Sequence, residues 1–184
     1  MYRKTFIKVL AVVPFISTAF RSILQRDESI SPCKTEKDAE GPFYKADAPS
    51  RIVIETKGAP LHIKGKVFQG SDCKTPAANA ILDVWHCDTN GDYDMSGYKG
   101  RAQIKTDAEG NYSFTTIFPP PYGNRPRHIH FKVRAERQPE LTTQLYFQGD
   151  PNIEKDFARH AEKSRVISLL SENNVKMGVF NIYL

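Results

Sequence analysis

Apolar and polar residues alternate in short segments over most of the chain after residue 50. Successive side chains of a β-strand point to opposite faces, so period-2 alternation predicts strands with one buried face. Short strands are therefore predicted at residues 51–55, 61–68, 80–85, 103–106, 112–117, 129–135, 142–147, 166–170 and 175–183. A chain of eight or nine such strands is typical of an all-β domain.

Turn and helix signals complete this pattern. The tetrapeptide Asp107-Ala108-Glu109-Gly110 separates two predicted strands and favours a hairpin between them. One short helix is predicted over residues 152–161, because Pro151 precedes it and Phe157 and Ala161 lie four residues apart. The fold class that follows is a β-sandwich with one short helix. A β-barrel stays open as the alternative, because strand spacing alone does not separate the two.

Composition supports one domain. The chain has 184 residues, of which 40% are hydrophobic and 26% charged, and this balance favours a folded core over disorder. We predict a single domain over residues 27–184, preceded by a separate basic segment at residues 1–26.

The net charge of +5 belongs to that N-terminal segment. Residues 1–26 hold five of the 26 basic residues and no acid, so residues 27–184 hold 21 basic and 21 acidic residues. Binding to a nucleic-acid backbone needs a basic surface. The balanced body therefore predicts no nucleic-acid partner.

The same segment resembles a signal peptide. Arg3, Lys4 and Lys8 precede an apolar run from Val9 to Ala19, and Ser17-Thr18-Ala19 has the small-x-small pattern of a cleavage site. A membrane-spanning helix needs ~20 apolar residues, so we predict export without a stable membrane anchor. A basic arm of a cytosolic protein remains the alternative.

Three cysteines leave the redox state open. Cys33, Cys73 and Cys87 form no CxxC or Cys/His cluster of the kind that binds zinc. In an oxidising compartment Cys73 and Cys87 are the expected pair, with Cys33 left free. Three unpaired thiols are the alternative.

The residues best suited to chemistry lie in the segment PPPYGNRPRHIHF, residues 119–131. His128 and His130 are two apart on a predicted strand, so both imidazoles point to one face and can bind one metal ion. Tyr122 precedes them in a proline-rich loop. A surface HxH pair and a turn tyrosine are the simpler interpretation of the same residues.

A second tyrosine comes from the loop after the strand at residues 80–85. Tyr93 is the first candidate there, and Tyr98 is a rival five residues later. Phenolate is a hard anionic ligand, so two tyrosines with two histidines favour Fe(III) over zinc or copper(I). A trivalent ion can also hold a phenol deprotonated against a pKa of about 10.

Four motifs in this order resemble the intradiol ring-cleavage dioxygenases, which include the catechol and protocatechuate 3,4-dioxygenases. The motifs are LDVWHCDTNGDYD, DAEGNYSFTTIFPPPYG, RPRHIHFKV and LTTQLYFQGDP, and the similarity covers about residues 40–160. The chain is similar to the smaller secreted branch of that family.

The resemblance implies a non-haem Fe(III) centre with Tyr93, Tyr122, His128 and His130 as ligands. It also implies that Arg125 stabilises charge on the bound ring, that Gln144 lines the same pocket, and that Tyr122 leaves the metal when substrate binds. The implied reaction cleaves a catechol-type diol between its two hydroxylated carbons with O2 and gives a muconate-type diacid. The short segments between Tyr122 and His128 and between Tyr93 and Arg101 imply an open pocket.

Two other functions are compatible with the same residues. A β-sandwich of the same fold without iron would be a catalytically inactive binding module, and a copper site could use the same histidines and tyrosines. The preferred diol and the oligomeric state are left open by the sequence.

Overall fold

The computed structural model describes residues 33–184. The predicted signal peptide, residues 1–26, lies outside the described residues. Within residues 33–184 no helix is long and apolar enough to span a membrane.

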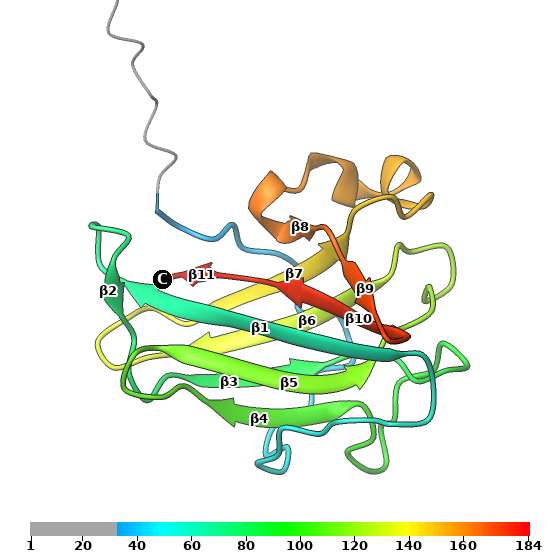
Figure 1. The fold of residues 1–184 in the computed structure, drawn as a ribbon, viewed down its shortest axis with the longest axis horizontal. Coiled ribbons are helices and arrows are strands. Elements are labelled where there is room, and N and C mark those ends of the chain that lie inside the picture. Colours follow the sequence, from blue (N-terminus) through cyan, green and yellow to red (C-terminus); the bar gives the residue numbers. More distant parts are fainter. Residues whose placement is uncertain (1–32) are drawn as a thin grey trace, which may run out of the picture. The chain divides into compact units, whose positions relative to one another are not determined.

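The described residues form two β-sheets (Figure 1). The five-stranded sheet has the order β4 (Arg101–Lys105), β3 (Ile81–Trp85), β6 (His128–Arg134), β7 (Leu141–Phe147) and β8 (Val166–Ile167). In the six-stranded sheet the long strand β1 (Pro60–Gln69) pairs with β2 (Thr75–Pro76), β5 (Asn111–Ile117), β10 (Val175–Val179) and β11 (Ile182–Tyr183). Strand β9 (Leu170–Glu172) pairs with β10.

The core lies between the two sheets. Leu61 and Ile63 of β1 and Phe114 of β5 are buried together with Leu82 of β3 and Phe131 of β6. These side chains come from the apolar positions of the period-2 pattern, so each sheet turns one face to the other. The predicted all-β sandwich is confirmed.

The predicted hairpin at residues 107–110 is wrong in its pairing. Strand β4 pairs with β3 in one sheet, whereas β5 pairs with β1 in the other. The turn itself is present: Asp107 accepts hydrogen bonds from the backbone N–H groups of Glu109 and Asn111. A tight turn can therefore lead from one layer of a sandwich to the other, which the local sequence does not distinguish from a hairpin.

The predicted strand at residues 51–55 is also wrong as a continuous strand. Ser50 forms an isolated bridge with Gln103 of β4, and Val53 forms another with Thr115 of β5. The segment thus runs from the edge of one sheet to the edge of the other. Of its apolar residues Ile52 and Val53 are exposed and Ile54 is buried, so the alternating pattern does not mark a strand with one buried face.

The segment at residues 152–161 is not a continuous helix. It forms two 3₁₀ turns, η1 (Ile153–Lys155) and η2 (Phe157–His160), and a third, η3 (Lys163–Arg165), follows. Asp156 is extended between the first two, and its side chain caps η2. An Asp that bonds the backbone locally interrupts the helix that the spacing predicted.

The predicted Cys73–Cys87 disulfide is replaced by a Cys33–Cys73 disulfide, with 5.3 Å between the two Cα atoms. Cys87 is free and buried, and its thiol lies 3.4 Å from the carbonyl oxygen of Pro120. The partner of Cys73 is 40 positions away in sequence, so spacing gave no sign of it.

Residues 35–46, here called the strap, cross the five-stranded sheet on the face away from the core. The backbone N–H of Asp38 donates to Thr142 of β7, and Gln144 donates to the carbonyl of Ala39 at 2.6 Å. Further along, the buried guanidinium of Arg101 donates to the carbonyl of Phe43. The strap therefore covers the sheet face that carries the two predicted histidine ligands.

Candidate metal centre

His128 and His130 lie on one face of β6, as the strand pattern predicts. Their ring centroids are 4.8 Å apart, and both side chains are buried. Ile129 and Phe131, the alternate residues, lie in the core on the opposite face. The strand thus fixes both imidazoles rigidly toward the strap.

Tyr93 meets both imidazoles. Its hydroxyl oxygen lies 3.1 Å from Nε2 of His128 and 3.2 Å from Nε2 of His130. Its ring stacks on Phe43 of the strap at 4.3 Å with 9° between the planes. The rival Tyr98 turns away, because its hydroxyl donates to the carbonyl of Ala46.

Tyr122 lies at the exposed side of this cluster. Its ring centroid is 5.4 Å from that of Tyr93 and 5.2 Å from that of Phe43. The side chain is 37% exposed, and its hydroxyl has no hydrogen-bond partner among residues 33–184. The structure therefore brings all four predicted ligands into one cluster, with Tyr122 nearest to solvent.

The polar atoms of the cluster fit a cation. Nδ1 of His128 donates to the carbonyl of Pro126 at 2.7 Å, so Nε2 of the neutral ring offers a lone pair. The single hydroxyl hydrogen of Tyr93 can serve only one of the two Nε2 atoms that face it. Nδ1 of His130 is buried without any partner, so a proton on Nδ1 has no acceptor, whereas a proton on Nε2 can be donated to the Tyr93 oxygen.

Burial favours the neutral forms of His128, His130 and Tyr93. It lowers the pKa of His128 to about 4 and that of His130 well below 6.5. Burial also raises the pKa of Tyr93 above its ordinary value of 10. Within the described residues no group of three His, Cys, Asp or Glu could hold a metal, so a metal here would need the phenols. Such a set suits a hard trivalent ion.

Arg125 and Gln144 lie together beside the cluster. Nη2 of Arg125 donates to Oε1 of Gln144 at 3.2 Å, and Nε donates to Asp156 at 2.9 Å. Gln144 pairs directly with His130 in the β6–β7 ladder, which places it on the imidazole face of the sheet. The two residues predicted to line the pocket therefore adjoin the predicted ligands.

Three further residues of this site were not predicted. Phe43 packs on both tyrosines, Trp85 stacks on His130 at 4.7 Å, and Tyr146 hydrogen-bonds Arg125. Tyr146 could have been found, because it is two residues after Gln144 on the same strand face. For Phe43 the available signal was Gly41-Pro42, a turn followed directly by an aromatic residue.

The protein is thus a two-sheet β-sandwich whose candidate metal site, a cluster of tyrosines and histidines, lies on the outer face of one sheet. A family model described as "Dioxygenase" matches residues 39–183. The chain therefore belongs to the intradiol dioxygenase family.

Curated relatives carry names from this family. The chain is 39% identical over 153 residues to catechol 1,2-dioxygenase 2 of Acinetobacter lwoffii. The matched region covers 67% of this chain and 55% of the relative. It is 33% identical over 147 residues to hydroxyquinol 1,2-dioxygenase of Corynebacterium glutamicum, with coverage of 65% and 48%. The chain thus spans about half the length of the curated relatives it matches.

Solved structures share the fold. The dioxygenase domain of a dioxygenase carbohydrate-binding protein fusion from Streptomyces sp. SirexAA-E superposes with a TM-score of 0.76 at 37% identity, covering 82% of this chain and 97% of that domain. Catechol 1,2-dioxygenase from Acinetobacter sp. ADP1 gives a TM-score of 0.71 at 29% identity, covering 82% and 62%.

Proposed function

We propose that this chain is a non-haem Fe(III) dioxygenase that cleaves catechol-type diols between the two hydroxylated carbons and releases muconate-type diacids. The observation that carries the proposal is the approach of the Tyr93 hydroxyl to Nε2 of both His128 and His130, at 3.1 and 3.2 Å. The relatives are named catechol and hydroxyquinol 1,2-dioxygenases, and these names support aromatic diols as the substrate class.

Tyr93, Tyr122, His128 and His130 would hold the iron. Bound Fe(III) would withdraw electron density from the diol and make its ring reactive toward O2. The two imidazoles keep their positions, because β6 fixes both and His128 also donates to Pro126. Tyr93 is held from the other side by the stacked ring of Phe43.

Tyr122 is suited to exchange places with the substrate. Its hydroxyl has no protein partner within residues 33–184, and its ring is exposed, so rotating it away breaks no protein hydrogen bond. Once displaced, its phenolate oxygen can accept one of the two protons of the incoming diol, and a hydroxide ion displaced by the diol would accept the other. No separate histidine base is then required.

Arg125 and Gln144 would act on the bound diol. The positively charged guanidinium of Arg125 would stabilise negative charge that develops on the ring. Gln144 anchors this arginine through Oε1 and is itself anchored by its amide, which donates to Ala39 of the strap. Their roles are positioning charge and limiting how the diol can lie.

Iron loading and oxygen uptake test the proposal together. Protein loaded with ferric iron should bind about one iron per chain, absorb in the visible as burgundy ferric tyrosinate, and consume O2 with catechol to give the diacid. The variant His128→Ala should lose the colour and the oxygen uptake together, because one imidazole ligand is removed. A colourless, iron-free chain that leaves catechol, protocatechuate and hydroxyquinol intact would instead indicate the catalytically inactive binding module.

We also propose that the chain is exported, as in the smaller secreted branch of the family. The basic and apolar pattern of residues 1–19 supports this proposal. So does the Cys33–Cys73 disulfide, since disulfides persist mainly in oxidising compartments.

A further inference from the structure

The guanidinium of Arg125 is held at two of its three nitrogen atoms. Nε and Nη2 donate to side chains of three residues, whereas Nη1 has no hydrogen-bond partner among residues 33–184. The side chain is only 24% exposed, so its orientation is set by these partners more than by water.

Tyr146 holds the inner side of the guanidinium. Its hydroxyl oxygen lies 3.1 Å from Nη2 of Arg125 and 3.0 Å from both Oδ2 of Asp38 and Oε1 of Gln144. The side chain is fully buried. Asp38 is paired in turn with the buried Arg165, so the hydroxyl is tied to an anchored carboxylate.

Asp156 and Phe157 also hold the guanidinium. Oδ2 of Asp156 accepts from Nε of Arg125 at 2.9 Å, and the ring of Phe157 lies 4.2 Å from the Cζ atom of the guanidinium. The other oxygen of Asp156 caps η2 by accepting from the N–H of Ala158 at 2.9 Å. The interrupted helix at residues 152–161 thus presents a carboxylate and an aromatic ring to the same arginine.

We propose that Tyr146 and Asp156 are positioning residues for Arg125, which together orient its guanidinium and leave Nη1 free for the bound diol. This inference rests on the proposed dioxygenase function. A long arginine side chain loses considerable rotamer freedom when it is fixed. Contacts that fix the arginine before substrate binds remove this entropy cost from the reaction. They also place the positive guanidinium where negative charge develops on the diol.

Kinetics of three variants test the proposal in iron-loaded protein. In Tyr146→Phe and in Asp156→Ala we expect kcat per bound iron to fall by about tenfold to a hundredfold, while KM for catechol changes little. Iron content and the visible band should stay as in the wild type, because no ligand is altered. Asp156→Asn should keep part of the activity, since its single amide oxygen can still accept from Nε of Arg125, while the η2 cap made by the second carboxylate oxygen is lost.

A matched control separates this effect from the loss of a buried hydroxyl. Tyr112 is also buried, and its hydroxyl donates to the carbonyl of Phe180 in the six-stranded sheet. Tyr112→Phe should lower stability without changing kcat per bound iron. Wild-type kcat in both Tyr146→Phe and Asp156→Ala would overturn the proposal.

Nuclear magnetic resonance of the full-length, iron-free protein tests the positioning directly. The Nε–Hε signal of Arg125, assigned by its loss in Arg125→Lys, should be sharp and protected from exchange in the wild type and in Asp156→Asn. It should broaden or shift to the position of a free arginine in Asp156→Ala. A signal at the position of a free arginine in the wild type would overturn the proposal that Tyr146 and Asp156 orient Arg125. If the signal is protected but the loaded protein does not consume catechol, the proposed function fails while the positioning stands.

Discussion

At the scale of single residues, Tyr93 and Tyr98 lie in one loop but have hydroxyls in different surroundings. The hydroxyl of Tyr93 faces two imidazole nitrogens, and that of Tyr98 donates to the strap. Their Phe variants are therefore a matched pair. Tyr93→Phe should weaken iron binding by at least ~10-fold, since even outer partners of a metal ligand are worth that much. Tyr98→Phe should bind iron normally. Iron content and the visible spectrum measure both, and the reverse result would move the ligand assignment to Tyr98.

His86 gives a prediction for the dependence of stability on pH. Burial lowers its pKa below 6.5, and the ring is held between the carbonyl of Cys87 and the hydroxyl of Thr116. Below pH 6.5 the unfolded chain therefore binds a proton that the folded state does not, so folded-state stability falls as the pH falls from 6.5 toward the folded pKa.

Removing this ring should make stability less dependent on pH. In iron-free protein, the free energy of unfolding should fall less steeply between pH 6.5 and 5 in His86→Gln than in the wild type, by up to ~1.4 kcal/mol per pH unit. Denaturant unfolding at several pH values measures this slope. His128 and His130 contribute equally to both proteins, so equal slopes would show that His86 does not remain neutral in the folded state.

At the scale of elements, the strands with one buried face were predictable and the strap was not. Strands such as β1 and β6 carry their own period-2 pattern, and the HxH spacing on β6 placed both histidines on one face before the structure was known. The strap has no such pattern. Its contacts join Asp38, Ala39 and Phe43 to β7 and β4, about 60 to 100 positions away in sequence. Phe43 and the anchoring of Gln144 were missed for this reason.

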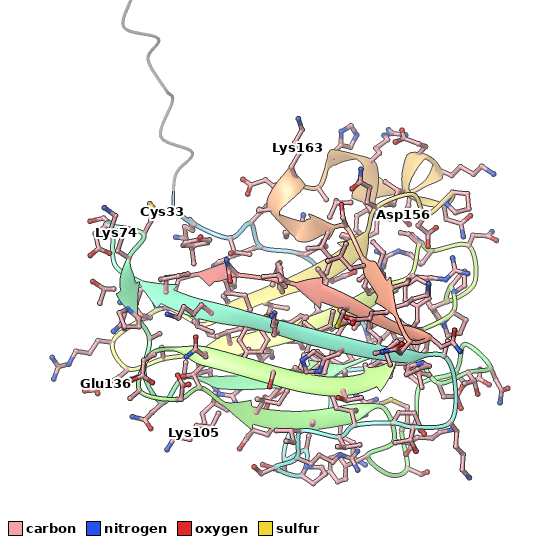
Figure 2. All side chains as sticks on the ribbon, viewed as in Figure 1. Cys33, Lys74, Lys105, Glu136, Asp156 and Lys163 are labelled. Atoms are coloured by element: carbon pink, nitrogen blue, oxygen red, sulfur yellow. A yellow bond between two sulfur atoms is a disulfide. The ribbon has the colours of Figure 1, made fainter. Side chains whose placement is uncertain are left out.

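The disulfide joins the start of the strap to the turn between β1 and β2, where Figure 2 shows Cys33 beside Lys74. For a closed loop of 40 residues the chain-entropy model gives a stabilisation of ~4 kcal/mol. The double variant Cys33→Ser with Cys73→Ser should be less stable by about this amount in denaturant unfolding. Reductant should destabilise the wild type similarly and leave the double variant unchanged. Equal stabilities would show that the strap is held by its hydrogen bonds alone.

At the scale of the whole molecule, the sequence predicted the sandwich but not which strands share a sheet. The turn at residues 107–110 connects the two layers, and residues 166–172 divide into β8 in one sheet and β9 in the other. Local pattern determines whether a residue is buried, whereas pairing depends on contacts between distant strands. The four predicted ligands were found together because motif order, and not strand pairing, identified them.

Export of the full chain is the prediction that concerns the molecule as a whole. If residues 1–19 direct export and cleavage follows Ala19, protein recovered outside the cytoplasm should begin at Phe20, as N-terminal sequencing or intact mass would show. That protein should have one free thiol, Cys87, after unfolding without reductant, and three after reduction. Val12→Asp with Val13→Asp places acids in the apolar run and should leave the chain uncleaved in the reducing cytoplasm, with three free thiols. A wild-type chain that stays in the cytoplasm, uncleaved and with three free thiols like this variant, would instead support the basic-arm alternative.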